Sequence, residues 1–186
     1  MYNPFRSSKR RAASRAAIER LYAAIVAQSR QEAFYTELGV ADTLEGRFEM
    51  VVLHTFLLCH RLKDGDGEEK AMSQEVFDAF VADMDATLRE LGVGDLSVPK
   101  KMKKIGAAFY GRAAAYDAAL ASPDHGALAT ALARNILEAE PDARAAPAFA
   151  AYVRRAAAAL AATPFAAIAG GDVAFPLPVI APAGAG

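Results

Sequence analysis

Apolar residues recur every three or four positions through most of this chain, and glycine or proline interrupts the pattern between one segment and the next. This spacing gives each segment one apolar face, which is the period of an α-helix and not the alternation of a β-strand. The pattern therefore predicts an all-α protein, built as a single multi-helix, bundle-like domain. The segments expected to be helical are 9–28, 31–38, 43–63, 68–91, 99–121, 124–139 and 143–162.

Residues that begin or end helices support several of these boundaries. Asp42 or Thr43 is suited to cap one helix, and Ser97 is expected to cap another in which Pro99 takes the first helical position. Gly39 and Gly92 lie where two helices should end, because glycine readily adopts the left-handed conformation that follows a helix C-terminus.

The two ends of the chain differ in composition from its centre. Residues 1–15 form a basic arm, residues 16–122 the core and residues 123–162 a pair of alanine-rich helices. Residues 163–186 form a Pro- and Gly-rich tail, expected to be extended around Val173 to Ile180 and disordered beyond. The arm lacks a signal-peptide apolar block, although its composition also resembles a transit peptide, which leaves organelle import as an alternative.

Composition narrows the class of protein further. The 186 residues carry 21 basic and 22 acidic side chains, a net charge of −1, which suits one domain with a real core and argues against DNA binding. Cys59 is the single cysteine, so no internal disulfide can form, and an inert buried thiol in a reducing compartment is expected. The longest apolar run, 51–59, is far shorter than the roughly 20 residues that cross a bilayer, so we expect a cytoplasmic protein.

Charged flanks accompany the apolar faces of two neighbouring helices. These flanks consist of Arg47, His54 and Arg61 on the first helix and of Asp78, Asp85 and Arg89 on the second. Two helices joined by a short turn are normally antiparallel neighbours, so the flanks could meet as an interhelical ion-pair ladder. The alternatives are a polar groove in which these side chains contact a partner, and flanks that are simply solvated.

A cluster of lysines follows Pro99, on the side of its helix opposite the apolar residues. The candidate partner-binding residues are Lys100, Lys101, Lys103, Lys104, Tyr110 and Arg112. Lysines in a first helical turn oppose the helix dipole at a cost of a few tenths of a kcal/mol, which favours a use for them. The phosphates of anionic lipid or of ribosomal RNA would both suit such a cluster, and a merely solvated face is the alternative.

Patterns typical of catalysis or metal binding do not occur. His54, His60 and His125 lack the spacing of metal ligands, and Asp83 and Asp85 fall on different sides of a helix. The glycines that follow residue 91 are better explained as a helix stop than as a phosphate-binding loop. We therefore expect no enzymatic activity, no cofactor and no metal.

Short motifs in a specific combination extend from about residue 21 to residue 120. They are Phe34-Tyr35, Leu38-Gly-Val40, Asp42-Thr43, Glu45-Gly-Arg-Phe-Glu-Met50, Leu53-His54, Phe77-Asp78, Asp83-Met-Asp85, Leu88-Arg-Glu90, Gly92-Val-Gly-Asp-Leu96, Val98-Pro-Lys100 and Phe109-Tyr-Gly-Arg112. In this combination the chain resembles the ubiquinol–cytochrome c chaperone family, whose members assist assembly of the respiratory cytochrome bc complex.

The resemblance implies a non-enzymatic chaperone that binds newly made cytochrome b. It further implies a cytoplasmic helical protein that works at the inner membrane surface, with the ribosomal tunnel exit and an anionic membrane surface as further partners. The alternative is a peripheral anionic-lipid or ribosome-binding adaptor without a client of its own. A holder of an apolar client needs an exposed apolar groove, for which Phe34, Tyr35, Met50 and the helix 68–91 are candidates.

Overall fold

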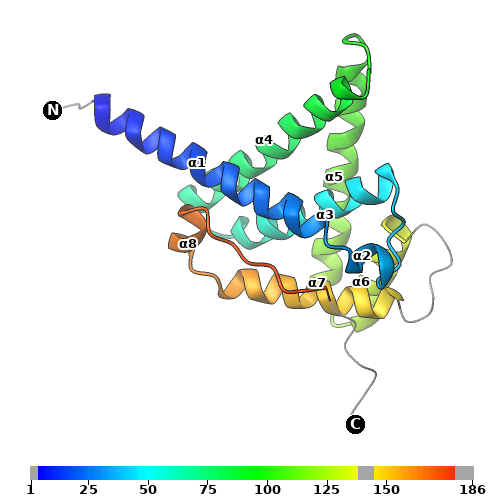
Figure 1. Cartoon of the computed structure of the whole chain (residues 1–186). Helices are drawn as coiled ribbons and strands as arrows, with labels where there is room; N and C mark the ends of the chain where they lie inside the picture. The colour runs from blue at the N-terminus through cyan, green and yellow to red at the C-terminus, as the bar shows by residue number, and fades with distance from the viewer. Residues whose placement is uncertain (1–3, 138–144, 179–186) are drawn as a thin grey trace.

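The computed structural model describes residues 4–137 and 145–178, and every regular element within these ranges is a helix (Figure 1). The predicted all-α class is therefore confirmed. The longer helices are α1 (Pro4–Ser29), α3 (Leu44–Leu62), α4 (Gly67–Glu90), α5 (Val98–Ala121), α6 (His125–Asn135) and α7 (Ala145–Ala162), and the short ones are α2 (Ala33–Thr36) and α8 (Phe165–Ala169).

Local signals explain where α3 begins. The Thr43 hydroxyl accepts a hydrogen bond from the Gly46 backbone N–H at 3.1 Å, so Thr43 is the N-cap. A side chain at position 46 would not fit, because a Cβ there would lie 2.0 Å from the Ala41 carbonyl oxygen. The glycine thus lets the preceding loop pack against the first turn of α3.

The turn between α4 and α5 differs from its prediction in one respect. Gly92 adopts φ +76° after α4, as expected of a helix stop. Ser97, however, makes no side-chain capping hydrogen bond, because its backbone lies in the helical region at φ −96° and ψ −24° and not in the extended region of an N-cap. Helix α5 begins at Val98, one residue before Pro99.

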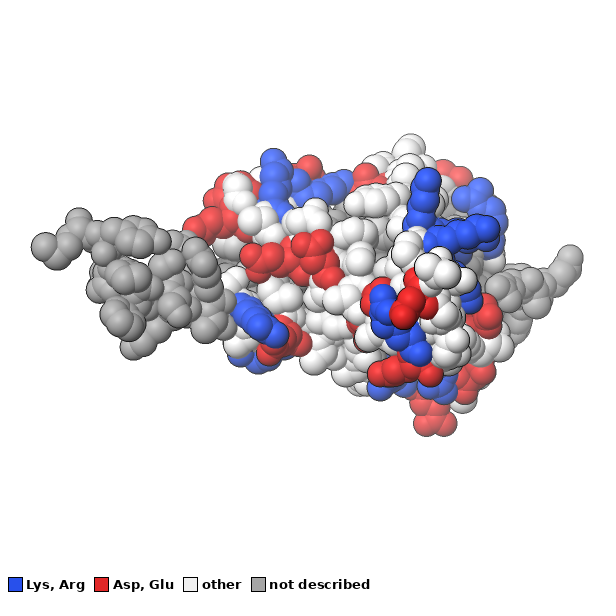
Figure 2. Space-filling model, turned by 90° about the horizontal axis from the view of Figure 1, so that it is seen from above, with Lys and Arg blue, Asp and Glu red and all other residues white. Residues whose placement is uncertain are grey.

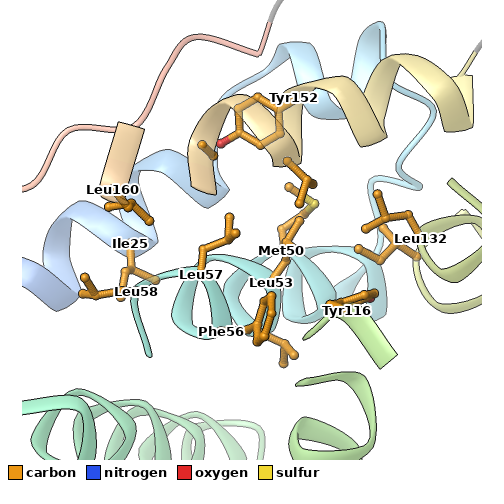
Figure 3. Close-up of a cluster of buried hydrophobic side chains, with 14 of the residues drawn as sticks. Ile25, Met50, Leu53, Phe56, Leu57, Leu58, Tyr116, Leu132, Tyr152 and Leu160 are labelled. Carbon is orange, nitrogen blue, oxygen red and sulfur yellow. The ribbon is translucent and has the colours of Figure 1, made fainter. Parts of the chain in front are cut away.

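Helix α3 forms the centre of the molecule. Helices α1, α4, α5 and α7 all contact it, and residues 52–58 are buried without interruption. Figure 3 shows Met50 and Leu57 pointing towards α7 while Phe56 points to the opposite side. A helix surrounded in this way has no solvated flank along its middle, so the predicted pattern of one core face beside a cationic edge was wrong there.

The tail also contains more structure than expected. Residues 165–169 form α8, whose Ile168 is completely buried, and residues 173–178 then continue without regular structure. This last segment lies over the core, where the Gln28 amide donates to the Pro176 carbonyl at 3.0 Å.

Several expectations fall outside the described residues. They concern the helix ends between 138 and 144, the tail from 179 including Ile180 and its predicted disorder, and the side chains of the basic arm up to residue 12. The division into arm, core, alanine-rich helices and tail stays a prediction.

Candidate functional site

An open groove lies between α1, α3, α4 and the first half of α5, with a volume of about 360 Å³. Its apolar walls are formed by Val26, Phe48, Val51, Met84, Leu88 and Ile105. Leu44 and Leu91 stand at its edge, each 57% exposed. This surface, called the groove below, offers apolar side chains to solvent where a closed core would have buried them.

The groove exists because α4 is covered along only part of its length. Met72, Val76, Phe80 and Met84 of α4 are buried, whereas Leu88 near its end is half-buried and Leu91 is exposed. In Figure 1 the end of α4 and the start of α5 extend away from the other helices as a hairpin. The apolar stripe of α4 therefore continues past the core and becomes a wall of the groove.

Two of the residues suggested for an exposed apolar surface lie elsewhere. Phe34 and Met50 are completely buried, because α2 and α3 both turn these side chains into the core beneath α7. Tyr35 does line the groove, as does Met84 of α4. The expectation of an open apolar surface was thus correct for α4 and Tyr35 and wrong for Phe34 and Met50.

Charged and polar side chains surround this apolar floor. Arg47 donates to the Asp42 carboxylate at 2.7 Å, which lowers the pKa of Asp42, and its guanidinium lies 5.7 Å from the centre of the Tyr35 ring. On the α1 side, Asp83 accepts a hydrogen bond from the Tyr22 hydroxyl at 2.8 Å. The rim is therefore polar and both signs of charge are represented on it.

A second hollow extends the groove along α1. It has a volume of about 500 Å³ and shares Val26, Arg30 and Asp83 with the groove. Ile18 and Ala79 supply apolar surface along this extension. An elongated partner lying along α1 could therefore contact both hollows.

His54, predicted on a charged flank, is completely buried instead. Its Nδ1 lies 2.8 Å from the Met50 carbonyl oxygen and its Nε2 lies 2.7 Å from the Tyr152 hydroxyl, which accepts from the Gln28 amide at 3.0 Å. Burial lowers the pKa of His54 to about 4, so the ring is neutral at pH 7. Phe175 of the tail packs edge-on against the ring at 5.2 Å.

The other members of the predicted ladder also have different partners. Arg61 pairs with Glu69 at 3.1 Å and donates to the carbonyl oxygens of Leu160 and Thr163, and Asp78 instead accepts from a neighbour on its own helix. The predicted ion pairs between the α3 and α4 flanks are therefore wrong. The reason is that α7 and the residues after it cover this end of α3 and turn Arg61 towards themselves.

The acidic flank of α4 is satisfied locally. Arg89 donates to Asp85 at 2.7 Å, one helical turn earlier, and also to Asp95 in the following turn at 2.5 Å. Of the flank residues predicted to form a ladder or a polar groove, Arg47 is the one that lines the groove.

The lysine cluster is exposed as predicted, but one of its companions is not. Lys100, Lys101, Lys103 and Lys104 are all exposed, and Tyr110 is 62% exposed while it packs against Phe77 and Phe109. Arg112 instead forms a two-pronged ion pair with Glu49, with 24% and 9% of the two side chains exposed. Arg112 therefore joins α5 to α3, and partner binding stays a prediction for the lysines and Tyr110.

Metal-ligating side chains and the single cysteine are the other groups with reactive chemistry in the described residues. No group of three or more His, Cys, Asp or Glu residues within 4–137 and 145–178 is placed to hold a metal ion. Burial raises the pKa of the Cys59 thiol to about 11, which keeps it protonated and unreactive at neutral pH. Among the helices that the structure describes, none has both the length and the apolarity to cross a membrane.

Sequence reasoning missed much of the groove. Val26, Arg30 and Leu44 were not singled out. Leu44 directly follows the N-cap of α3, and its side chain is exposed in the structure. No periodic signal identifies such a surface, because α1, α3 and α4 contribute to it from positions far apart in the sequence.

The fold and this groove define an all-α protein whose open apolar surface has a charged rim, an arrangement typical of proteins that hold other polypeptides. The chain belongs to the ubiquinol-cytochrome C chaperone family, whose sequence model matches residues 36–175.

Known relatives agree with this assignment. The crystal structure of the Cbp3 homolog from Brucella abortus superposes with a TM-score of 0.83 at 43% identity, covering 94% of this chain and 95% of that one. Ubiquinol-cytochrome-c reductase complex assembly factor 1 of Xenopus laevis is 25% identical over 123 residues, 66% of this chain and 61% of the relative. The Mus musculus assembly factor is 29% identical over 115 residues, 62% of this chain and 39% of the relative. The matches thus span less than two thirds of both animal proteins.

Proposed function

We propose that this protein is a non-enzymatic assembly chaperone for the ubiquinol–cytochrome c reductase complex and that its client is newly made cytochrome b. Family membership supports the assembly role. The observation that carries the choice of an apolar client is the groove, because apolar side chains line it beneath a charged rim. A client that will enter the lipid bilayer exposes apolar side chains, which such a surface can cover.

The size of the groove limits how the client binds. Its volume of about 360 Å³ falls at the lower end of ligand pockets, which are roughly 300–1,000 Å³. A whole α-helix is about 10–12 Å wide with its side chains and would not enter it. We infer that a client helix lies across the rim and places apolar side chains from one face into the groove and its extension along α1.

The charged rim would keep this contact reversible and selective. Arg47, Asp42 and Asp83 already have hydrogen-bond partners within the protein. Because these charges are already satisfied, they would form only weak ion pairs with the client. Polar groups around an apolar patch also discourage self-association of the free chaperone.

Leu44→Asp tests the groove directly. Leu44 is 57% exposed at the edge of the groove, so the substitution should leave the fold intact and place a charge where the client is expected. Burying one leucine contributes about 1.5–3 kcal/mol, so we expect at least about tenfold less cytochrome b recovered with the protein. The measurement is co-purification of newly made cytochrome b from a host that lacks its own copy of this gene.

Leu177→Asp is the matched control, because Leu177 is 68% exposed and does not line the groove. A photo-crosslinking residue at position 44 should capture cytochrome b, and the same residue at position 177 should not. Equal recovery with both variants, together with a normal level of the complex when the gene is deleted, would contradict the proposal and favour the adaptor without a client.

A further inference from the structure

The turn between α4 and α5 presents leucine side chains to solvent at the end of a projecting hairpin (Figure 1). We call residues 91–98 the hairpin tip. Leu96 within it is 99% exposed, and Leu91 is 57% exposed. A leucine with almost its whole surface in water contributes nothing to the core, so folding does not explain its presence at this position.

The tip is a defined turn. The Val93 backbone N–H donates to the Leu88 carbonyl at 3.0 Å, and the Ser97 N–H donates to the Gly94 carbonyl at 2.8 Å. These hydrogen bonds hold the backbone on both sides of Leu96, which therefore points outward from a fixed support. An apolar side chain presented in this way can enter an apolar phase at a small cost in chain entropy.

Four exposed lysines follow this leucine in sequence, and the acidic Asp95 that precedes it pairs with Arg89. Lys100, Lys101, Lys103 and Lys104 are exposed on the first turns of α5, and none of them pairs with a carboxylate among the described residues. The N-terminal end of α5 adds the partial positive charge of its helix dipole. Viewed from above, several groups of basic side chains lie on the half of the molecule away from the N-terminus, with acidic side chains between them (Figure 2).

We propose that the hairpin tip docks on an anionic lipid surface. Leu96 enters the acyl boundary and the lysines contact the phosphates of the headgroups, the combination by which peripheral proteins bind membranes. Leu91 belongs both to the tip and to the edge of the groove, so docking would place the groove beside the bilayer. This inference goes beyond the proposed client and does not rest on it.

The exposed leucine distinguishes a membrane from RNA as the partner. Phosphates of either kind would attract the lysines, but a projecting leucine gains nothing from a phosphodiester backbone, whereas it gains the transfer free energy of its side chain in lipid. Proteins that bind single-stranded RNA usually offer aromatic platforms for base stacking. The two aromatic side chains nearest to these lysines in sequence are Phe109, which is buried, and Tyr110, which already packs against Phe77 and Phe109.

Co-sedimentation of the full chain with vesicles tests the proposal. We expect binding to phosphatidylcholine vesicles that contain phosphatidylglycerol, little binding to phosphatidylcholine alone, and weaker binding at high salt. Leu96→Ser should lower the partition coefficient about tenfold. The double substitution Lys103→Glu and Lys104→Glu should lower it by more than about tenfold, because each surface lysine adds roughly a fivefold preference for anionic lipid.

Matched controls use residues of the same type away from the tip. Leu177→Ser removes a leucine that is 68% exposed, and Lys70→Glu reverses an exposed lysine near the other end of α4, so neither should change vesicle binding.

Three results would overturn the proposal. The first is absence of vesicle binding, and the second is an equal loss of binding in the tip and control variants. The third is binding to ribosomal RNA that depends on Lys103 and Lys104 but is unchanged in Leu96→Ser, without binding to anionic vesicles. Unaltered helical circular dichroism in each variant would show that the fold is retained, as expected for changes at exposed positions.

Discussion

Arg112→Met should lower the free energy of unfolding by about 3–5 kcal/mol, because it leaves the buried carboxylate of Glu49 without the guanidinium that faces it. The Nε and Nη2 atoms of Arg112 each donate a hydrogen bond to the carboxylate of Glu49, whose side chain is only 9% exposed. Urea denaturation followed by circular dichroism measures the change, with the slope in urea expected to stay constant.

Two further variants show whether the lost pair is the cause. Replacing both partners, Glu49→Leu with Arg112→Met, should recover most of the loss, since apolar residues of similar volume often substitute for a buried ion pair without a penalty. Arg47→Met removes an arginine that also donates to a carboxylate, but both partners are more than half exposed, so the unfolding free energy should hardly change. Equal losses in Arg47→Met and Arg112→Met would contradict this account.

Acid should destabilise the protein through His54, by about 3 kcal/mol between pH 7 and pH 4. Burial lowers the pKa of His54 to about 4 from its ordinary value of 6.5. The unfolded chain therefore binds a proton as the pH falls through 6.5, while the folded protein resists it until about pH 4. The stability contributed by the neutral ring is complete above pH 6.5 and is lost progressively below it.

The hydrogen bonds of His54 explain why the neutral ring is required. With Nδ1–H donating to the Met50 carbonyl, Nε2 accepts from the Tyr152 hydroxyl, which in turn accepts from Gln28. Protonation at Nε2 would turn this acceptor into a donor and leave the Tyr152 hydroxyl proton without its present acceptor.

The measurement is the free energy of unfolding at intervals between pH 7 and pH 4, compared between the parent protein and His54→Gln. The variant should be less stable at pH 7 but should show a flatter pH dependence. His60→Gln is the control, because it alters a half-buried ring that is paired with Asp117. Its free energy of unfolding should fall between pH 7 and pH 4 as in the parent protein. Carboxylates such as Asp117, whose pKa is lowered by Lys63, begin to lose their contribution only near the acid end of this window. If the unfolding free energy of His54→Gln fell with pH as steeply as that of the parent protein, other groups would be responsible for the acid effect.

Helix ends were predictable because they depend on residues close in sequence. Gly92 stops α4 through its left-handed backbone, and Thr43 caps α3 through its own hydroxyl. Ser97 failed as a cap because a turn set by the Gly94 carbonyl holds its backbone in the helical region. A cap is thus predictable where the local sequence alone fixes the backbone.

The burial and the partners of the α3 side chains could not be predicted from local sequence. A helical period identifies one face for the core, yet His54 is completely buried and Arg61 turns to α7 and the residues after it. The cause is that α1, α4, α5 and α7 all pack on α3, a property of the assembled helices and not of its own sequence.

The sequence by itself determined the all-α class, the helix stops and the exposed lysines beside the hairpin tip, because helical period, glycine conformation and charge act over a few residues. Only the tertiary structure decided that Leu88 and Leu91, apolar residues on the core stripe of α4, form a wall of the groove. Whether an apolar side chain becomes core or binding surface depends on whether another helix covers it, and in this protein α4 and α5 extend beyond the helices that could have done so.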